Sequence, residues 1–371
     1  MTQNIIYYLI GVFVFAFALS YYLYPKISDI IHFKKLMDSP NDRSSHLVAT
    51  PNLGGIAFFI SLFLSFCFID EFDDNNFIMA IIPGLIILFV VGLKDDLVIL
   101  SPLSKLCAQI ASALFLIFHK SFSVDSLHGF MGIENIPFLL SSTVEVLIIV
   151  TIINAINLLD GIDGLASIIG VITLSLFGSL FFSLEIYLLT LICAVMTGSL
   201  LAFLRFNLSS KRKIFMGDTG SMLLGFIIAF MTIRVFALDA ELLETLPFQT
   251  QNMPYVLSAI LIIPLFDTVR VFTVRILKKK SPFLADRSHI HHLILDYYKI
   301  THKRASLIIG LVNFLVVLLF SFLAINTTQR VLLVFFIALI LAATIFFFVL
   351  NRPRIIRKIK YLWYKKTNLK L

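Results

Sequence analysis

The feature that most constrains this chain is a series of apolar stretches long enough to cross a lipid bilayer. A spanning helix needs about 20 apolar residues, with a working range of about 17–25. Candidate spans lie at 5–24, 53–69, 77–93, 102–118, 136–158, 164–184, 186–204, 220–238, 254–274, 305–325 and 331–350. Apolar types make up 59% of the residues and charged types only 14%, which excludes a water-soluble fold. We therefore expect an all-α, polytopic membrane protein of about 11 transmembrane helices.

Two of these candidate spans, 164–184 and 186–204, are separated by a single residue. The apolar stretch from Gly164 to Leu204 is far too long for a single helix, and only Glu185 interrupts it. We therefore predict a tight two-helix hairpin that turns near Glu185.

The distribution of basic residues predicts the orientation of the chain. With the N-terminus outside, the inside segments are 25–52, 94–105, 205–219, 275–304 and the tail after Leu350. These segments hold 26 of the 30 Lys and Arg residues. Because an excess of Lys and Arg marks cytoplasmic loops, the C-terminus is predicted to be cytoplasmic. The net charge of +8 is then a consequence of topology and does not indicate a nucleic-acid partner.

The chain is predicted to have a single membrane-embedded domain, residues 1–350, and a short tail, residues 351–371. In the tail, Ile355, Ile359 and Leu362 recur at helical spacing among Lys and Arg residues. A basic amphipathic helix of this kind would lie on an anionic inner leaflet. A solvated tail is the alternative interpretation.

Polar residues that a bilayer would penalise gather at the predicted cytoplasmic ends of the spans. They form five clusters, at Gly92–Leu97, Asn154–Ala166, Phe215–Ser221, Asp286–His292 and Ser44–Gly55. A site open to substrates from the cytosol would lie at this face of the membrane.

Two of these clusters are acidic. Asp95 and Asp96 are adjacent carboxylates at a membrane boundary, so they repel each other unless a cation or hydrogen-bond donors neutralise them. Pairing with nearby lysines is the purely structural alternative. Asn154, Asn157 and Asp160 step by three residues and therefore line one arc of a helix end, with Asp163 in the following turn.

Two further clusters suit phosphate groups, whereas Ser44–Gly55 by itself indicates little. The Gly217–Ser221 segment begins a helix whose free N–H groups attract phosphate, and Asp218 beside them suggests a divalent cation. Taken alone, this motif could also be only a capped helix start. Arg287 stands next to three histidines, and this group favours a cationic pocket for a diphosphate over a zinc site, which lacks matching ligands. Together these groups are typical of phosphoryl transfer, where a protein positions reactants and neutralises charge.

In this order, the motifs resemble those of the polyprenyl-phosphate N-acetylhexosamine-1-phosphate transferases. The resemblance runs through His46–Gly55, Lys94–Asp96, Asn154–Ala166, Phe215–Ser221 and Asp286–His292. The His-Ile-His-His form is similar to that of the GlcNAc-1-phosphate transferases that begin O-antigen, common-antigen or teichoic-acid glycans. It departs from the three consecutive histidines usual in phospho-N-acetylmuramoyl-pentapeptide transferases.

The resemblance implies a reaction and its partners. The donor would be UDP-GlcNAc, the acceptor undecaprenyl phosphate, and the products lipid-diphospho-GlcNAc and UMP. The family needs Mg²⁺, with Mn²⁺ as the alternative ion. The expected location is the bacterial inner (plasma) membrane, with the active site facing the cytoplasm, and a homodimer is left open.

The resemblance also implies roles for individual residues. The catalytic candidates are Asp95, Asp96, Asp160 and Asp163, and the expected metal ligands are Asp218, Asn157 and Asp96. The substrate-binding candidates are Lys105 for the lipid phosphate, Phe215 for uracil, Arg287, His289, His291 and His292 for the diphosphate, and Asn154, Asn157 and His46.

Two other classes of protein share some of these features. A secondary transporter would explain the polar residues Glu145, Asp267 and Arg270 within spans, but its site should lie near the midplane. A CDP-alcohol phosphatidyltransferase shares the spacing of Asp160 and Asp163, but its later paired aspartates are missing and it has fewer spans.

Overall fold

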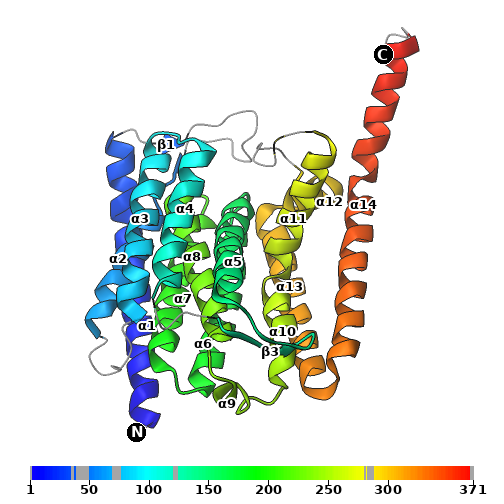
Figure 1. The fold of residues 1–371 in the computed structure, drawn as a ribbon. Helices are drawn as coiled ribbons and strands as arrows, with labels where there is room; N and C mark the ends of the chain where they lie inside the picture. Colours follow the sequence, from blue (N-terminus) through cyan, green and yellow to red (C-terminus); the bar gives the residue numbers. More distant parts are fainter. Residues whose placement is uncertain are drawn as a thin grey trace.

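The computed structural model describes residues 2–34, 37–38, 50–68, 77–119, 124–279, 281 and 288–367. These residues form a bundle of helices that run along one axis (Figure 1). The helices are α1 (Thr2–Lys34), α2 (Gly55–Ser65), α3 (Phe77–Leu97), α4 (Pro102–Ile117), α5 (Phe138–Leu159), α6 (Leu165–Ser183), α7 (Tyr187–Asn207), α8 (Gly217–Phe236), α9 (Ala240–Leu243), α10 (Met253–Ile260), α11 (Ile262–Leu277), α12 (Ile290–Tyr298), α13 (His302–Asn326) and α14 (Gln329–Thr367).

The expectation of an all-helical chain holds for the bundle but not for every connection. Strands β1 (Met37–Asp38) and β2 (Thr50–Pro51) pair antiparallel, as do β3 (Ser126–Phe130) and β4 (Ile133–Asn135). These pairs are too short for a periodic pattern, so the sequence offers no signal for them.

Among the described residues, eight helices are long and apolar enough to cross a membrane, or nine if the bent pair formed by 250–260 and Ile262–Leu277 counts as one span. Two further apolar helices, α2 and α4, are shorter. Every predicted span overlaps a helix or the bent pair, and the hairpin turns between α6 and α7 as predicted. The chain is therefore a mostly helical, multi-pass membrane protein, while the count of 11 stays a prediction.

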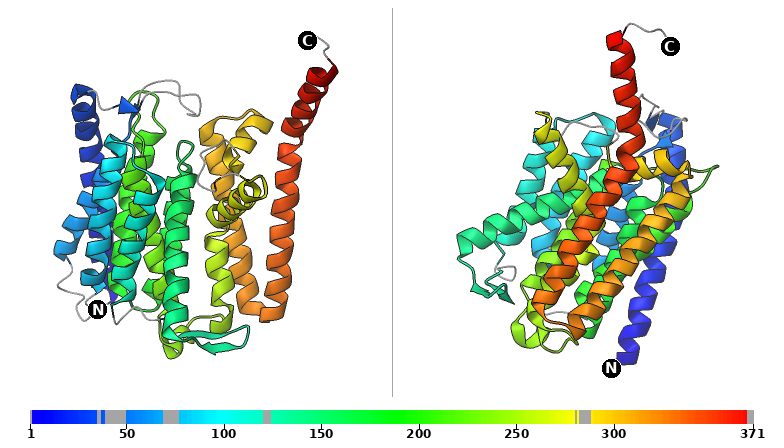
Figure 2. Two further views of the ribbon diagram at one scale, coloured as in Figure 1. Left: turned by 45° about the horizontal axis from the view of Figure 1, so that its top comes forward. Right: turned by 90° about the vertical axis from the view of Figure 1, so that its right-hand side faces the viewer.

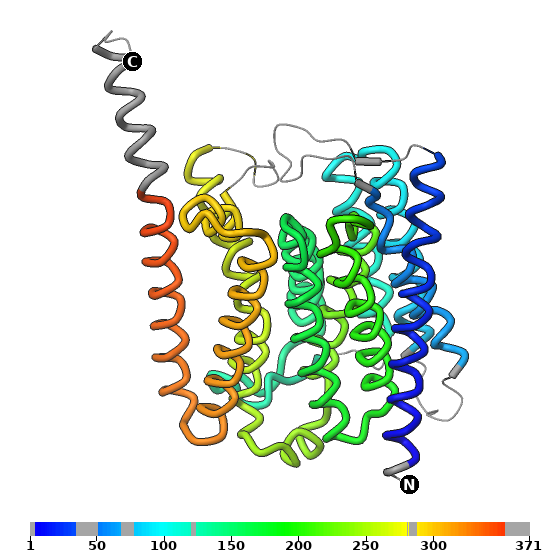
Figure 3. The backbone as a smooth tube through the Cα atoms, turned by 180° about the vertical axis from the view of Figure 1, so that it is seen from behind, coloured from blue at the N-terminus to red at the C-terminus, as the bar shows by residue number. Residues whose placement is uncertain are grey.

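The core of the bundle is built around α8. In its most apolar window 89% of the residues are buried, against 11% for α14 and 22% for α1. A helix that is apolar on all sides is expected in a core or in lipid. Helix α8 lies in the core, where it packs against α2, α3 and α5. Helices α1 and α14 lie at opposite edges of the bundle (Figure 3).

Glycines let the neighbours of α8 approach its backbone. A Cβ atom on Gly92 of α3 would lie 2.6 Å from the Cα atom of Thr219, and one on Gly55 of α2 would lie 2.2 Å from the backbone nitrogen of Gly220. Small residues at helix contacts permit this closeness in membranes. The N-terminus of α8 is thus held between α2 and α3.

The helix ends that carry the predicted clusters meet at one end of the bundle. Helices α3 and α5 end there, α4 and α8 begin there, and α12 lies beside them (Figures 1 and 2). The chain's C-terminus also lies on this side, and α9 and β3 lie at the opposite end. Helix α14 passes the predicted boundary at residue 350 without a break. The side chains that follow Arg352 are not described, so the place of the tail on a membrane stays a prediction.

We predict that Gly92→Ala destabilises the protein, because the added methyl group would overlap the backbone of α8. The expected loss is about 1–3 kcal/mol of unfolding free energy, seen as a lower melting temperature of the purified protein in detergent. The control is Gly11→Ala in α1, where nothing lies within 4 Å of an added Cβ atom. Equal melting temperatures for the two variants would contradict the packing argument.

Candidate active site

The first element of the site is a carboxylate that caps α8. Asp96, in the last turn of α3, accepts hydrogen bonds from the backbone nitrogens of Asp218 (2.7 Å) and Thr219 (3.0 Å). The Thr219 hydroxyl donates a third, at 2.6 Å. An anion at a helix N-terminus satisfies free N–H groups and is favoured by the helix dipole. Asp96 therefore fixes the position of Asp218.

The segment before α8 is held by the segment before α2. The Phe215 backbone nitrogen donates to the Pro51 carbonyl at 2.7 Å, and Gly54 donates back to the Phe215 carbonyl at 3.0 Å. Gly217 has a φ of +71°, and a Cβ atom there would lie 2.0 Å from the Asn52 carbonyl oxygen. Only glycine fits this turn. His46 lies outside the described residues, so its predicted contact is not seen.

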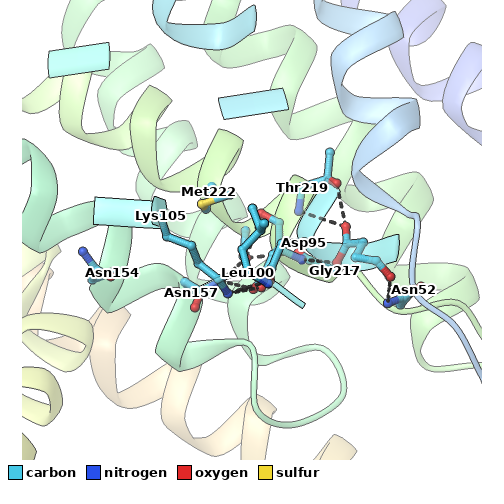
Figure 4. Close-up of polar contacts among 12 residues, drawn as sticks. Asn52, Asp95, Leu100, Lys105, Asn154, Asn157, Gly217, Thr219 and Met222 are labelled. Carbon is cyan, nitrogen blue, oxygen red and sulfur yellow. Dashed lines mark hydrogen bonds and ion pairs between the residues drawn. The ribbon is translucent and has the colours of Figure 1, made fainter. Parts of the chain in front are cut away.

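The centre of the site is a lysine between two carboxylates (Figure 4). The Nζ atom of Lys105 lies 2.6 Å from Asp95 and 2.5 Å from Asp218. The amide of Asn157 donates to the other oxygen of Asp218, at 2.5 Å, and to the Ser221 hydroxyl, at 2.8 Å. Four of the predicted residues, far apart in the sequence, thus share one polar cluster.

The residues of this cluster offer oxygen donors, which Mg²⁺ prefers. Asp95 and Asp218 converge on one cationic atom, which is the arrangement that a bound ion requires. Asp95 and Asp218 are the carboxylates of this cluster that would hold a divalent ion. No group of three or more His, Cys, Asp or Glu side chains suited to a metal is found among the described residues. Both oxygens of Asp96 are already engaged by α8, which favours a positioning role for Asp96.

Asn154 lies apart from the carboxylates, about one turn before Asn157 on α5. Its amide donates to Gln109 of α4 at 2.6 Å and to the Val150 carbonyl at 2.8 Å. Figure 4 shows it to one side of Lys105. The predicted arc of polar residues therefore divides, with Asn157 in the cluster and Asn154 joining two helices.

A second polar group surrounds Asp163, in the loop after α5. Its carboxylate contacts Lys213 Nζ at 2.7 Å and His302 Nδ1 at 3.2 Å. Burial acts to raise the pKa of Asp163, but these two partners outweigh it and lower the pKa. Lys213 also lies 5.1 Å from the centre of the Phe215 ring. Sequence reasoning missed Lys213 and His302, since Lys213 counted only as a topological charge.

The pKa of the neighbouring acid, Asp160, shifts in the opposite direction. Burial, followed by repulsion from Asp218 and Asp163, raises the pKa of Asp160. Its side chain is half-buried, at the end of α5. The pKa values of Asp160 and Asp163 thus shift in opposite directions, although the two acids stand three residues apart.

The histidine motif reaches the same loop from α12. The ring of His291 is buried and packs on Gly161, where a Cβ atom would lie 2.4 Å from Nε2. Burial lowers the pKa of His291 well below its usual value, followed by repulsion from His292. Burial therefore disfavours the charged form of the His291 ring. Arg287 lies outside the described residues.

Comparison with known proteins identifies relatives of this chain. The sequence profile of glycosyl transferase family 4 matches residues 78–236. An undecaprenyl-phosphate α-N-acetylglucosaminyl 1-phosphate transferase of Pasteurella multocida is 33% identical over 291 residues, which cover 74% of this chain and 75% of the relative. The Haemophilus influenzae protein of the same name is 32% identical over 288 residues, 75% of this chain and 76% of the relative. A Bacillus subtilis protein named as a probable transferase of this kind is 29% identical over 287 residues, 75% of each chain.

The fold and the site define a membrane-embedded transferase. The chain belongs to glycosyl transferase family 4. This confirms the resemblance seen in the sequence, and the transferase names of the relatives replace the transporter alternative.

We predict that Thr219→Val weakens the anchor of α8, because it removes a hydrogen bond to the Asp96 carboxylate. Hydrogen bonds to charged groups contribute about 1.5–3 kcal/mol, so the melting temperature in detergent should fall. The control is Thr232→Val in the same helix, which removes only the hydroxyl bond to the Ile228 carbonyl. A larger effect at Thr232 would contradict the capping role of Asp96.

Proposed function

We propose that this enzyme transfers GlcNAc-1-phosphate, or a related N-acetylhexosamine-1-phosphate, from the UDP-sugar to undecaprenyl phosphate and releases UMP. The observation that carries the proposal is the convergence of Asp95, Lys105, Asn157 and Asp218 at one end of the bundle. The names of the relatives, which specify the lipid phosphate and the sugar phosphate, support it. The reaction would be the first membrane step of a cell-surface glycan pathway.

We place the site at the cytoplasmic face of the bacterial inner membrane. The predicted inside segments hold 26 of the 30 Lys and Arg residues, which supports this orientation. The short helices α2 and α4 and the bent pair complete the 11 spans of the proposal. In this orientation a UDP-sugar reaches the site from the cytosol, while a polyprenyl phosphate stays in the membrane and presents its headgroup.

The proposed reaction is a direct in-line displacement. An oxygen of the lipid phosphate attacks the β-phosphorus of the UDP-sugar, and the bond from that phosphorus to the UMP oxygen breaks, so the electron pair leaves with UMP. A phosphate monoester has its second pKa near 6 and is mostly dianionic at pH 7. Asp95 would take the remaining proton, which helps the attack without being essential to it.

Different residues of the site would bind different parts of the two substrates. Lys105 orients the lipid phosphate, and Asp96 and Asn157 hold Asp218 in place. Phe215, Lys213 and Asp163 form a surface suited to the uracil end of the donor. The histidines of α12, with Arg287, face the diphosphate in this proposal. Mg²⁺, held at Asp218 beside Asp95, would neutralise the charge of the departing UMP.

A direct test incubates the purified protein with undecaprenyl phosphate, Mg²⁺ and a panel of UDP-sugars, and measures UMP. We expect UMP to form with UDP-GlcNAc only when the lipid phosphate is present. Rapid release of UMP without the acceptor would contradict direct displacement and favour a covalent intermediate on an aspartate.

We predict that Asp218→Asn abolishes nearly all UMP formation, because the substitution removes the charge shared with Lys105 and needed for a divalent ion. Asp239→Asn is the matched control, since this exposed acid stands before α9 at the opposite end of the bundle. Most of the activity remaining in Asp218→Asn would rule out its assignment to the metal.

A further inference from the structure

A buried carboxylate outside the carboxylate cluster makes three contacts around the start of α12. Asp267 of α11 is only 3% exposed. One of its oxygens lies 2.8 Å from Nδ1 of His289. The other accepts the Ile290 backbone nitrogen at 2.9 Å and the Arg270 guanidinium at 2.5 Å. The Arg270 contact follows from the i,i+3 spacing on α11, whereas the contacts with His289 and Ile290 join residues 22 and 23 positions apart.

The Arg270 side chain reinforces the same connection. Its guanidinium also donates to the Ser288 carbonyl at 2.8 Å and lies 4.1 Å from the centre of the Phe347 ring of α14. Residues 288–290 are thus tied to α11 through both a carboxylate and a guanidinium. These contacts lie at the start of α12, so they fix the orientation of the histidine motif relative to α11.

The chemistry of an imidazole makes this contact specific. A carboxylate on Nδ1 holds the proton there, which fixes the tautomer and the plane of the ring. Nε2 is then the ring nitrogen left for another partner. The His289 ring is stacked on His291, with centroids 5.7 Å apart and planes at 8°, and His291 packs on Gly161. Through His291, the His289 ring is therefore connected to the loop that carries Asp160 and Asp163.

We infer that Asp267 is a positioning residue that acts through His289 on the donor diphosphate. This inference rests on the proposed function and adds a residue that the motifs do not assign. Asp267 does not touch substrate in this role; it sets the tautomer and orientation of a ring that does. The alternative is a purely structural role, in which Asp267 only fastens α12 to α11.

A double-mutant cycle separates the two roles. Asp267→Asn keeps an oxygen for the Ile290 nitrogen but removes the charge that holds the Nδ1 proton. We expect kcat/KM for UDP-GlcNAc to fall about 10- to 100-fold, with KM for undecaprenyl phosphate unchanged. In a His289→Ala background, adding Asp267→Asn should change kcat/KM less than about twofold, because residues that act through one contact are not additive.

Controls keep the outcomes distinct. Asp239→Asn makes the same chemical change at the far end of the bundle and should leave both KM values unchanged. If Asp267→Asn does not fold, Asp267→Glu replaces it, because this variant keeps the charge but displaces the ring. Its smaller loss of kcat/KM should again vanish in the His289→Ala background. Additive losses in the cycle, or wild-type kinetics in Asp267→Asn, would overturn the positioning role. No UMP from the wild-type protein with any UDP-sugar would instead overturn the proposed function.

Discussion

The ammonium of Lys105, shared by Asp95 and Asp218, is the interaction on which the site depends. It joins α4 to α3 and to the first turn of α8, so three helix ends are brought to one point. The net stability from such partly buried pairs is small, since desolvation offsets the attraction, but losing one partner leaves uncompensated charge. The interaction therefore serves geometry more than stability, and it keeps two carboxylates close enough to share a cation.

This geometry in turn relies on close backbone packing around α8. Gly92 and Gly55 bring α3 and α2 against the first turn of that helix, and Asp96 caps it from α3. On the other side of the site, Asp267 ties α12 to α11 and so brings His291 to Gly161. The carboxylates and the histidines thus occupy one end of the bundle through two separate supports, one made of glycine contacts and one of a buried ion pair.

Much of this arrangement could be predicted from sequence because bilayer chemistry is restrictive. A polar residue at a span end is costly, so Asp95, Asp96, Asn157 and Asp218 stand out against an apolar background. Lys213 and His302 do not stand out, because a lysine or histidine in an inner loop has an ordinary topological explanation. Their contacts with Asp163 depend on how α13 and the segment between α7 and α8 meet the loop after α5, and no local pattern encodes these contacts.

The sequence by itself determined the helical membrane class, the hairpin near Glu185, the resemblance to the transferases and the set of polar motifs, since each follows from local hydrophobicity or residue spacing. Only the tertiary structure decided that Lys105 lies between Asp95 and Asp218, that Asp96 caps α8, and that Asp267 holds His289. These contacts join residues from 10 to 123 positions apart. Periodicity reports which face of a helix is apolar, whereas side-chain packing between helices selects the partner of each polar group.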